Sequence, residues 1–311
     1  MEFLLSEAFK PSYFFKPKSE REVSDLLKRY GSRSRIVAGG TGLYEVAHRG
    51  LLSDVEALID ITGLGLEYIR KEEQQVCFGA CASMASIFRS RELDGLPELG
   101  AVRDALSLIQ PLQVKNIATV GGAICTALPF FDLPIALISL DSSVVIAPGN
   151  REAKLAEFIS GYFSVNLEEG EFVREIRTPI LSKRGKGRAG SSFQKFALSG
   201  DDWALVNCAA FVQLGDPMKL EASKARLCFG GGVGDRPKRA SETERRLEGK
   251  SLEDESSIKN ILDQTLPRDI ETISDIRASA EYRMQIAKVI GRRALSSAAK
   301  RALEHYADHV S

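Results

Sequence analysis

Ile36-Val37-Ala38-Gly39-Gly40-Thr41-Gly42-Leu43 is the stretch of sequence that decides the fold of this chain. It begins as an apolar, β-branched run and ends in closely spaced glycines, a pattern that predicts a strand followed by a tight loop. Glycine has no Cβ and adopts positive φ angles, so successive amide groups can turn toward one anion. The segment is therefore a candidate site for a diphosphate. A glycine-rich turn without a ligand is the alternative, because short glycine motifs often occur by chance.

The segment does not fit the two common nucleotide motifs. In a G-x-G-x-x-G pattern that starts at Gly40, the third glycine position holds Glu45, and the Lys-Ser/Thr ending of a P-loop is absent. Asp60 follows at about the spacing of a ribose-binding acid. It stands at the end of an apolar run, however, so we expect a residue that closes a strand rather than a ligand.

The elements around this segment predict the start of an α/β unit. An extended piece at 14–17 precedes a helix that Ser19 caps and Gly31 ends. After the glycines, alternation over 67–82 predicts a hairpin, and helices are expected at 84–89 and 98–109.

A second glycine pair follows about 80 residues later, in the segment Thr119-Val120-Gly121-Gly122-Ala123. Paired glycines after a β-branched run let the backbone approach the same ligand from another side, and Thr119 offers a hydroxyl to a phosphate or a ribose. Asp132 follows between aromatic and proline residues. Its carboxylate is expected either to accept a hydrogen bond from a ribityl or ribose hydroxyl, or to cap a helix that begins at Pro134.

Composition limits the classes of function. The chain has 311 residues with 42 basic and 42 acidic side chains, so no net charge draws it to nucleic acid or to an anionic membrane. No apolar run is long enough to span a membrane, and the N-terminus lacks the pattern of a secretory signal. The five cysteines are scattered and odd in number, which argues against a disulfide framework and favours a cytoplasmic protein. We expect no metal site.

Several motifs taken together resemble the FAD-binding subunit of the molybdenum hydroxylases, which include aerobic carbon monoxide dehydrogenase (medium subunit) and bacterial xanthine dehydrogenases (flavin subunit). In the first half the motifs are Ala38-Gly39-Gly40-Thr41-Gly42-Leu43, Asn116-Ile117-Ala118-Thr119-Val120-Gly121-Gly122 and Pro129-Phe130-Phe131-Asp132. In the second half, the segments 225–234, 236–240 and 276–283 are similar to the C-terminal flavoprotein domain of that family.

The resemblance implies an α+β protein with a two-subdomain FAD-binding fold of the PCMH or vanillyl-alcohol-oxidase type. A C-terminal α+β domain with an antiparallel sheet and helices is expected to follow. The expected FAD-binding domain covers 1–181, with subdomains of about 1–55 and 56–181, and the C-terminal flavoprotein domain covers 191–311. Residues 182–190 are expected to form a linker, as their Gly, Ser and basic composition also indicates.

The resemblance also implies that both glycine segments hold the diphosphate of FAD. Asp132, the backbone near Val173, and Lys195 are expected to contact the cofactor as well. Lys195 matches the family lysine beside the isoalloxazine, where an ammonium stabilises the negative charge of reduced flavin. The expected cofactor-binding residues are Ile36, Val37, Ala38, Gly39, Gly40, Thr41, Gly42, Leu43, Thr119, Val120, Gly121, Gly122, Ala123, Asp132, Val173 and Lys195. No catalytic residue is expected in this chain.

The function implied by the resemblance is electron transfer within a larger enzyme. FAD would pass electrons from [2Fe–2S] clusters to an acceptor such as NAD or a quinone. The implied partners are an iron–sulfur small subunit and a molybdopterin large subunit, assembled as a dimer of heterotrimers. Ala123 and Leu198 to Gly200 stand where the family usually has Asn and Arg. A flavin-free scaffold subunit and a free-standing flavin oxidase therefore remain as alternatives.

Overall fold

A small parallel sheet opens the fold of the computed structural model, which describes residues 9–180, 188–215 and 219–310. Its strands are β1 (Tyr13–Phe15), β2 (Ser34–Val37) and β3 (Ala57–Asp60), in the order β1-β3-β2. The helices α1 (Glu20–Tyr30) and α2 (Thr41–His48) connect these strands. Ser19 caps α1 as expected, because its hydroxyl accepts a hydrogen bond from the Glu22 amide at 3.3 Å.

The first sheet extends a few residues beyond the subdomain boundary predicted at about residue 55. Strand β3 pairs in parallel with both β1 and β2, so it is the centre of the first sheet and the boundary lies after Asp60. A strand that follows a crossover helix returns to its own sheet, and the sequence of 56–61 gave no sign of its partners. Asp60 itself ends β3 as expected, and its carboxylate accepts hydrogen bonds from the Thr62 amide and hydroxyl.

The second sheet is antiparallel and has the order β4-β5-β10-β6-β7. Its strands are β4 (Ile69–Lys71), β5 (Gln75–Gly79), β6 (Ser143–Ala147), β7 (Arg151–Lys154) and β10 (Phe172–Pro179). The associated helices are α3 (Met84–Arg89), α4 (Gly100–Ser107), α5 (Leu112–Ile117), α6 (Val120–Thr126), α7 (Asp132–Ser139) and α8 (Leu155–Phe158). A short hairpin of β8 (Ile159–Gly161) and β9 (Ser164–Val165) precedes β10. Short 3-10 turns cover Gly31–Arg33, Thr62–Leu64, Arg91–Leu93 and Pro97–Leu99.

The third sheet is also antiparallel, with the order β11-β12-β13-β14. Its strands are β11 (Arg188–Phe196), β12 (Val206–Leu214), β13 (Ala222–Gly231) and β14 (Lys238–Arg239), and its helices are α9 (Ser241–Leu247), α10 (Glu255–Asp269) and α11 (Ala280–Val310). The predicted linker at 182–190 falls partly on 181–187, which lie outside the described residues. Residues 188–190 form the beginning of β11.

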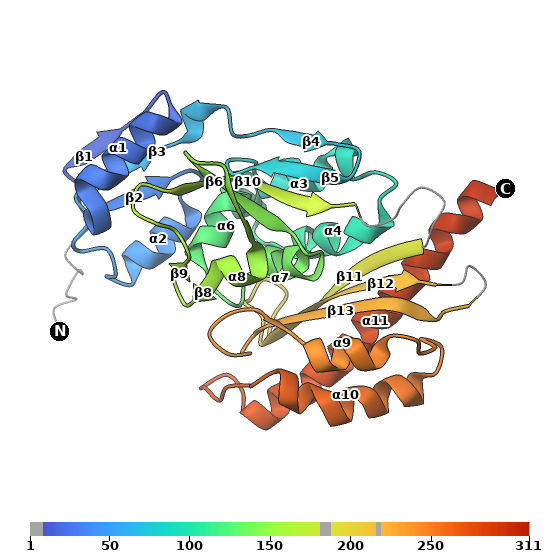
Figure 1. Ribbon diagram of the computed structural model, residues 1–311. Coiled ribbons are helices and arrows are strands. Elements are labelled where there is room, and N and C mark those ends of the chain that lie inside the picture. Colours follow the sequence, from blue (N-terminus) through green and yellow to red (C-terminus); the bar gives the residue numbers. More distant parts are fainter. Residues whose placement is uncertain (1–8, 181–187, 216–218, 311) are drawn as a thin grey trace.

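Both faces of the third sheet are covered by helices. Successive side chains of a strand point to opposite faces, and on β12 they divide in this way between two cores. Val206, Cys208 and Ala210 pack with α9, α10 and α11, whereas Ala209 and Phe211 pack with α4 and α7. In Figure 1 this sheet accordingly lies between the green helices of the first part and the red α11.

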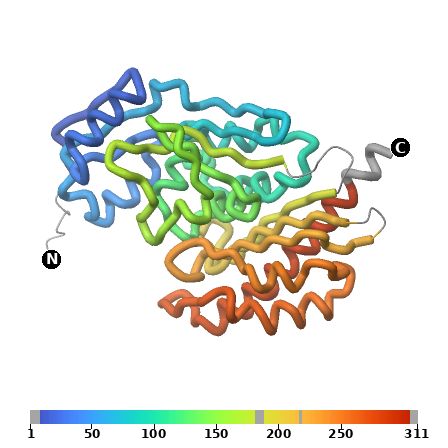
Figure 2. Tube along the Cα trace, viewed as in Figure 1, coloured from blue at the N-terminus to red at the C-terminus, as the bar shows by residue number. Residues whose placement is uncertain are grey.

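Charged contacts fix the third sheet to the first part of the chain. Arg301 of α11 contacts Asp104 of α4 at 2.9 Å. Asp141, which follows α7, pairs with Arg226 and Arg239 of β13 and β14. Figure 2 shows the resulting path, in which the first sheet and the last helix lie at opposite ends of the molecule. Elements from both halves of the sequence therefore meet in the middle of the molecule.

Candidate functional site

A cavity of about 880 Å³ lies between the first sheet, α6, α7 and β11, and both glycine segments line it. Of the predicted cofactor-binding residues, those that line the cavity are Ile36, Ala38, Gly39, Gly40, Thr41, Gly42, Leu43, Thr119, Gly121, Gly122, Ala123, Asp132, Val173 and Lys195. Val37 and Val120 do not line it. Val37 lies within the β2 ladder, and Val120, the first residue of α6, is fully buried in the core. Segments far apart in the sequence thus meet around one space.

The first glycine segment presents free backbone donors to this cavity. Gly40 adopts a φ of +73° and stands at the N-cap of α2, whose first turn follows at once. Within the described part of the chain, the amides of residues 39–43 donate to no protein acceptor. The N-terminus of a helix carries partial positive charge, so these amides form a favourable place for an anion such as a diphosphate.

The first glycine segment packs directly against residues that flank the second one, in contacts too close for an added Cβ. A Cβ on Gly39 would lie 1.9 Å from the carbonyl oxygen of Ile117 at the end of α5. A Cβ on Gly42 would lie 2.5 Å from the Thr126 hydroxyl at the end of α6. Both distances are far below ordinary van der Waals contact, and at Gly39 the opposing atom belongs to the backbone, so glycine is required there for the cavity wall to close.

The second glycine pair differs from expectation, because its amides are already bonded within the protein. A helix, α6, begins directly after Thr119, whose hydroxyl accepts from the Gly122 amide at 3.2 Å as an N-cap. The Val120 and Gly121 amides each donate at 3.0 Å to carbonyls beyond β5, those of Ala82 and Ala80. The Ala123 amide donates to the Thr119 carbonyl. The second segment therefore forms part of the cavity wall, and only the amides of the first segment remain available to a diphosphate.

Asp132, Lys195 and Asn207 form the polar centre of the site. The Lys195 ammonium donates to Asp132 Oδ2 at 3.1 Å, and the Asn207 amide nitrogen donates to Asp132 Oδ1 at 2.7 Å. The Asp132 side chain is only 5% exposed and that of Lys195 11%. Burial raises the pKa of the Asp132 carboxyl above its ordinary value, against the opposing effects of Lys195 and Asn207. The capping role considered for Asp132 is wrong, because α7 begins at this residue and its carboxylate accepts from side chains instead.

Aromatic residues close another part of the cavity. The rings of Phe130 and Trp203 stack with centroids 4.4 Å apart and an angle of 20° between their planes. The Arg49 guanidinium, at the end of α2, lies 5.2 Å from the Trp203 ring. Arg277 holds the Trp203 segment in place through hydrogen bonds to the Trp203 carbonyl and the Asp202 carboxylate.

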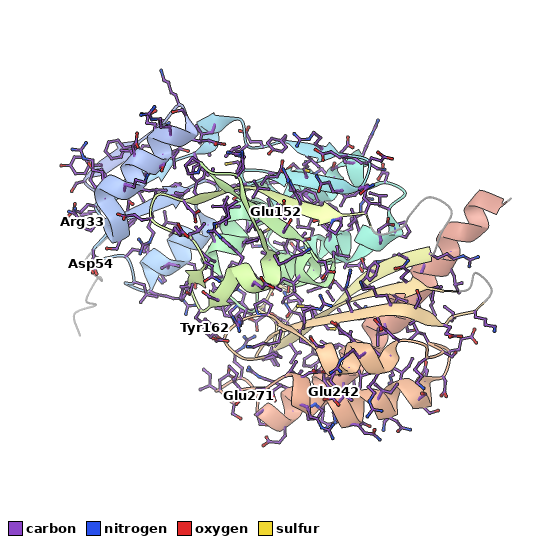
Figure 3. All side chains as sticks on the ribbon, viewed as in Figure 1. Arg33, Asp54, Glu152, Tyr162, Glu242 and Glu271 are labelled. Carbon is purple, nitrogen blue, oxygen red and sulfur yellow. The ribbon has the colours of Figure 1, made fainter. Side chains whose placement is uncertain are left out.

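The turn between β8 and β9 brings two exposed aromatic residues to the junction of the two halves. Phe163 lines the cavity and adopts a φ of +51°. Its neighbour Tyr162, labelled in Figure 3, lies at the lower edge of the first part, toward the C-terminal elements. Partial burial raises the pKa of Tyr162 above its ordinary value, against the opposing effect of Arg283 and with smaller contributions from Asp235 and Asp275.

Sequence reasoning missed Arg49, Trp203 and Asn207. Trp203 is the only tryptophan of the chain and follows two acidic residues in a turn, which is a signal that an exposed loop carries a function. Arg49 and Asn207 gave no comparable signal. Their positions depend on contacts between elements that are remote in the sequence.

Comparison with known families decides what this site belongs to. Residues 7–181 match the family described as the FAD binding domain in molybdopterin dehydrogenase, and residues 191–298 match the CO dehydrogenase flavoprotein C-terminal domain. The chain belongs to this family of flavoprotein subunits. The expected family, the α+β FAD-binding fold and FAD as the cofactor of this chain are confirmed.

Individual relatives of this flavoprotein subunit agree over most of their lengths. The glyceraldehyde dehydrogenase medium chain of Sulfolobus acidocaldarius is 30% identical over 86% of this chain and 91% of its own. The carbon monoxide dehydrogenase medium chain of Hydrogenophaga pseudoflava is 28% identical over 91% of this chain and 95% of its own. A solved structure of that organism's carbon monoxide dehydrogenase, which lacks the Mo-pyranopterin moiety, superposes with a TM-score of 0.84, 27% identity, and coverage of 94% and 98%. The chain is therefore a medium subunit of a molybdenum hydroxylase, an oxidoreductase.

The residues of this flavoprotein subunit fit FAD. The free amides at the start of α2 suit a diphosphate. No side chain of the glycines fills the cavity beside these amides. The Lys195 ammonium, paired with Asp132, lies at the same cavity.

Cys125 gives a first testable prediction, because its thiol lines the FAD cavity. The residue keeps partial exposure through the cavity, but surrounding protein atoms raise the pKa of its thiol to about 12. Since only the thiolate reacts, we expect alkylation by iodoacetamide near pH 8 to be roughly a thousandfold slower than for a free cysteine. Mass spectrometry of peptides after timed quenching measures this rate, with the urea-unfolded chain as the control. A rate within tenfold of the unfolded chain would contradict the prediction.

Proposed function

We propose that FAD lies in this cavity with its diphosphate on the amides of residues 39–43 and its isoalloxazine at the Asp132–Lys195 end. The observation that carries the proposal is the set of backbone donors at the start of α2 that donate to no acceptor in the described residues. The first amides of a helix have no partner within it, and residues 39–43 are only partly buried and line the cavity, so these donors are available to a ligand with acceptor oxygens. We keep the other predicted residues that line the cavity, Val173 included, as the wall around the cofactor.

The side chains at the other end would orient the ring system and keep water from it. Lys195 would place its ammonium beside the pyrimidine edge, and Asp132 would hold that ammonium through the 3.1 Å ion pair. The stacked rings of Phe130 and Trp203 would cover this end of the cavity. FAD, when bound, supplies the exchange of one or two electrons at a time, which couples one-electron carriers to two-electron acceptors.

We propose that electrons reach this subunit from [2Fe–2S] clusters of an iron–sulfur small subunit and leave to NAD or a quinone-type acceptor. A molybdopterin large subunit would complete the enzyme, as a dimer of heterotrimers. The support is that several relatives carry the name of a medium chain or of one subunit of a complex. We also keep the division into an FAD-binding domain to residue 181 and a C-terminal domain from 191, because the two family matches end and begin there.

A cytoplasmic location is part of the same proposal. All five cysteines are free thiols, and four of them are buried, as is usual in a reducing compartment. Among the described residues, no helix is both long and apolar enough to cross a membrane.

Titration of the purified chain with FAD tests the function directly. We expect tight binding, seen as a shift of the flavin absorbance bands and a change of flavin fluorescence. Gly40→Val should weaken binding by about tenfold to a hundredfold, because Gly40 holds a φ of +73° that a β-branched residue adopts only with strain. Gly63→Ala is the control, since a Cβ there meets no atom within 4 Å and the glycine has an ordinary φ. A wild-type chain that takes up no FAD would favour the flavin-free scaffold instead.

A further inference from the structure

We propose that Asn207 is a positioning residue for the cofactor, which orients the Asp132 carboxylate so that the Lys195 ammonium is held at the cavity wall. The inference rests on the FAD-binding function proposed above. Asn207 does not line the cavity, so it would act through Asp132 and not by touching the flavin.

The register of the third sheet brings the two donors together. Lys195 of β11 and Asn207 of β12 are directly paired, so they are cross-strand neighbours. The alternation along β12 places Asn207 on the same face as Ala209 and Phe211, the face covered by α4 and α7. Asp132 stands at the first turn of α7. Two neighbouring side chains of one sheet therefore converge on one carboxylate from the opposite layer.

The two hydrogen bonds occupy different oxygens of Asp132. Asn207 takes Oδ1 at 2.7 Å and Lys195 takes Oδ2 at 3.1 Å. A rotation of the carboxylate would lengthen both bonds at once, so the shorter bond to the fully buried Asn207 fixes the direction in which Oδ2 points. The position of the ammonium follows from the position of Oδ2.

An amide side chain at position 207 would be unfavourable if its only role were to fill space in the core. Its side-chain oxygen is buried and has no hydrogen-bond partner among the described residues. Gly230 lies opposite it in β13, and a Cβ on Gly230 would come within 2.9 Å of that oxygen. An unpaired buried polar atom is unfavourable, and an apolar side chain of similar size would avoid it. The hydrogen bond from the amide nitrogen to Asp132 is the interaction that offsets this penalty.

Removal of the Asn207 amide should change the affinity for oxidised FAD and for reduced FAD by different amounts. A displaced ammonium matters most when the flavin carries negative charge, and least when it is neutral. In the full-length chain carrying Asn207→Leu, we expect the dissociation constant of oxidised FAD to rise about threefold or less. That of dithionite-reduced FAD, titrated without oxygen, should rise about thirtyfold, a size consistent with the loss of one hydrogen bond to a charged group.

The ratio of the dissociation constant of oxidised FAD to that of reduced FAD separates positioning from packing, because the loss of positioning should lower it. A purely structural role would raise both constants equally and leave their ratio within twofold of wild type, which would overturn the inference. Thr178→Val is the matched control, because it removes a buried hydrogen bond, the 2.9 Å contact with Ser142, away from the cavity. It should leave the ratio unchanged. If the wild-type chain binds neither form of FAD, the proposed function fails and not this step alone.

Asn207→Asp provides a conservative variant whose effect depends on pH. The charged groups in contact with this position are Asp132 on α7 and, through it, Lys195 on β11, while β13 presents only Gly230. A protonated acid at 207 can donate to Asp132 as the amide does, whereas an ionised one repels it. Relative to wild type at the same pH, we expect a normal ratio near pH 6 that falls as the pH is raised to about 8.5. The Leu variant should show the same low ratio throughout, and a flat profile in the Asp variant would contradict the proposal.

Discussion

Gly39→Ala is expected to lower the free energy of unfolding by about 3 kcal/mol and to weaken FAD binding by at least about a hundredfold. The added Cβ would lie 1.9 Å from the Ile117 carbonyl oxygen and 2.8 Å from its carbon, and both are backbone atoms. No side-chain rotation relieves such a contact, so the first glycine segment and the end of α5 must move apart. The amides of residues 39–43 then no longer face the cavity as a group. Urea unfolding followed by circular dichroism, with an FAD titration, measures both effects.

Gly63→Ala serves as the control for Gly39 as well. It makes the same chemical change in a turn where the new Cβ has open space around it, and a small effect of either sign is expected. If Gly39→Ala bound FAD within threefold of wild type, the close packing of Gly39 against the end of α5 would not be needed for the site.

Lys195→Met is expected to make the stability of the chain strongly dependent on pH. The substitution leaves Asp132 buried without its cation, so the pKa of that carboxyl, already raised by burial, rises further. At a pH below the ordinary carboxyl pKa, both the folded and the unfolded chain hold the proton, and the variant should resemble wild type. As the pH rises through the raised folded-state pKa, only the folded state is penalised by the charge, so stability is lost. Near pH 8 we expect a loss of about 2 to 3 kcal/mol.

A second substitution checks the cause of that loss. Asp132→Asn added to Lys195→Met removes the carboxylate and should abolish the additional dependence on pH. Thermal unfolding of both variants and wild type between about pH 5 and pH 8 gives the comparison. If the single variant lost the same stability at every pH, the ion pair would not be the source of the effect.

Much of the fold could be predicted because its signals are local. Ser19 and Gly31 delimit α1, and the run before Gly39 is a strand, since caps, turns and β-branched runs act within a few residues. The strand β3 was expected, but the sheet to which it belongs was not, for the opposite reason. Its place between β1 and β2 is decided by pairing partners about 20 and 45 residues away, and the apolar run itself is the same in either sheet.

The site divides in the same way between local and remote determinants. Thr119 and the glycines after it were recognised as part of the site, but their amides are taken by Ala80 and Ala82, which the sequence of the segment does not reveal. Lys195 was found through its resemblance to the family. Asn207 was not found, because its role follows from the register of β11 and β12 and from the packing of that face on α7.

The shared third sheet has a consequence for how the protein is made. Lys195 lies on β11 and Trp203 lies in the connection from β11 to β12, so one end of the cofactor chamber is built from residues that leave the ribosome after the whole first part has emerged. The amides near Gly39 are synthesised early, but the cofactor chamber is complete only when α7 and the later strands have been synthesised. Cofactor loading should therefore follow chain completion, and a nascent chain released at about residue 180 should retain no flavin.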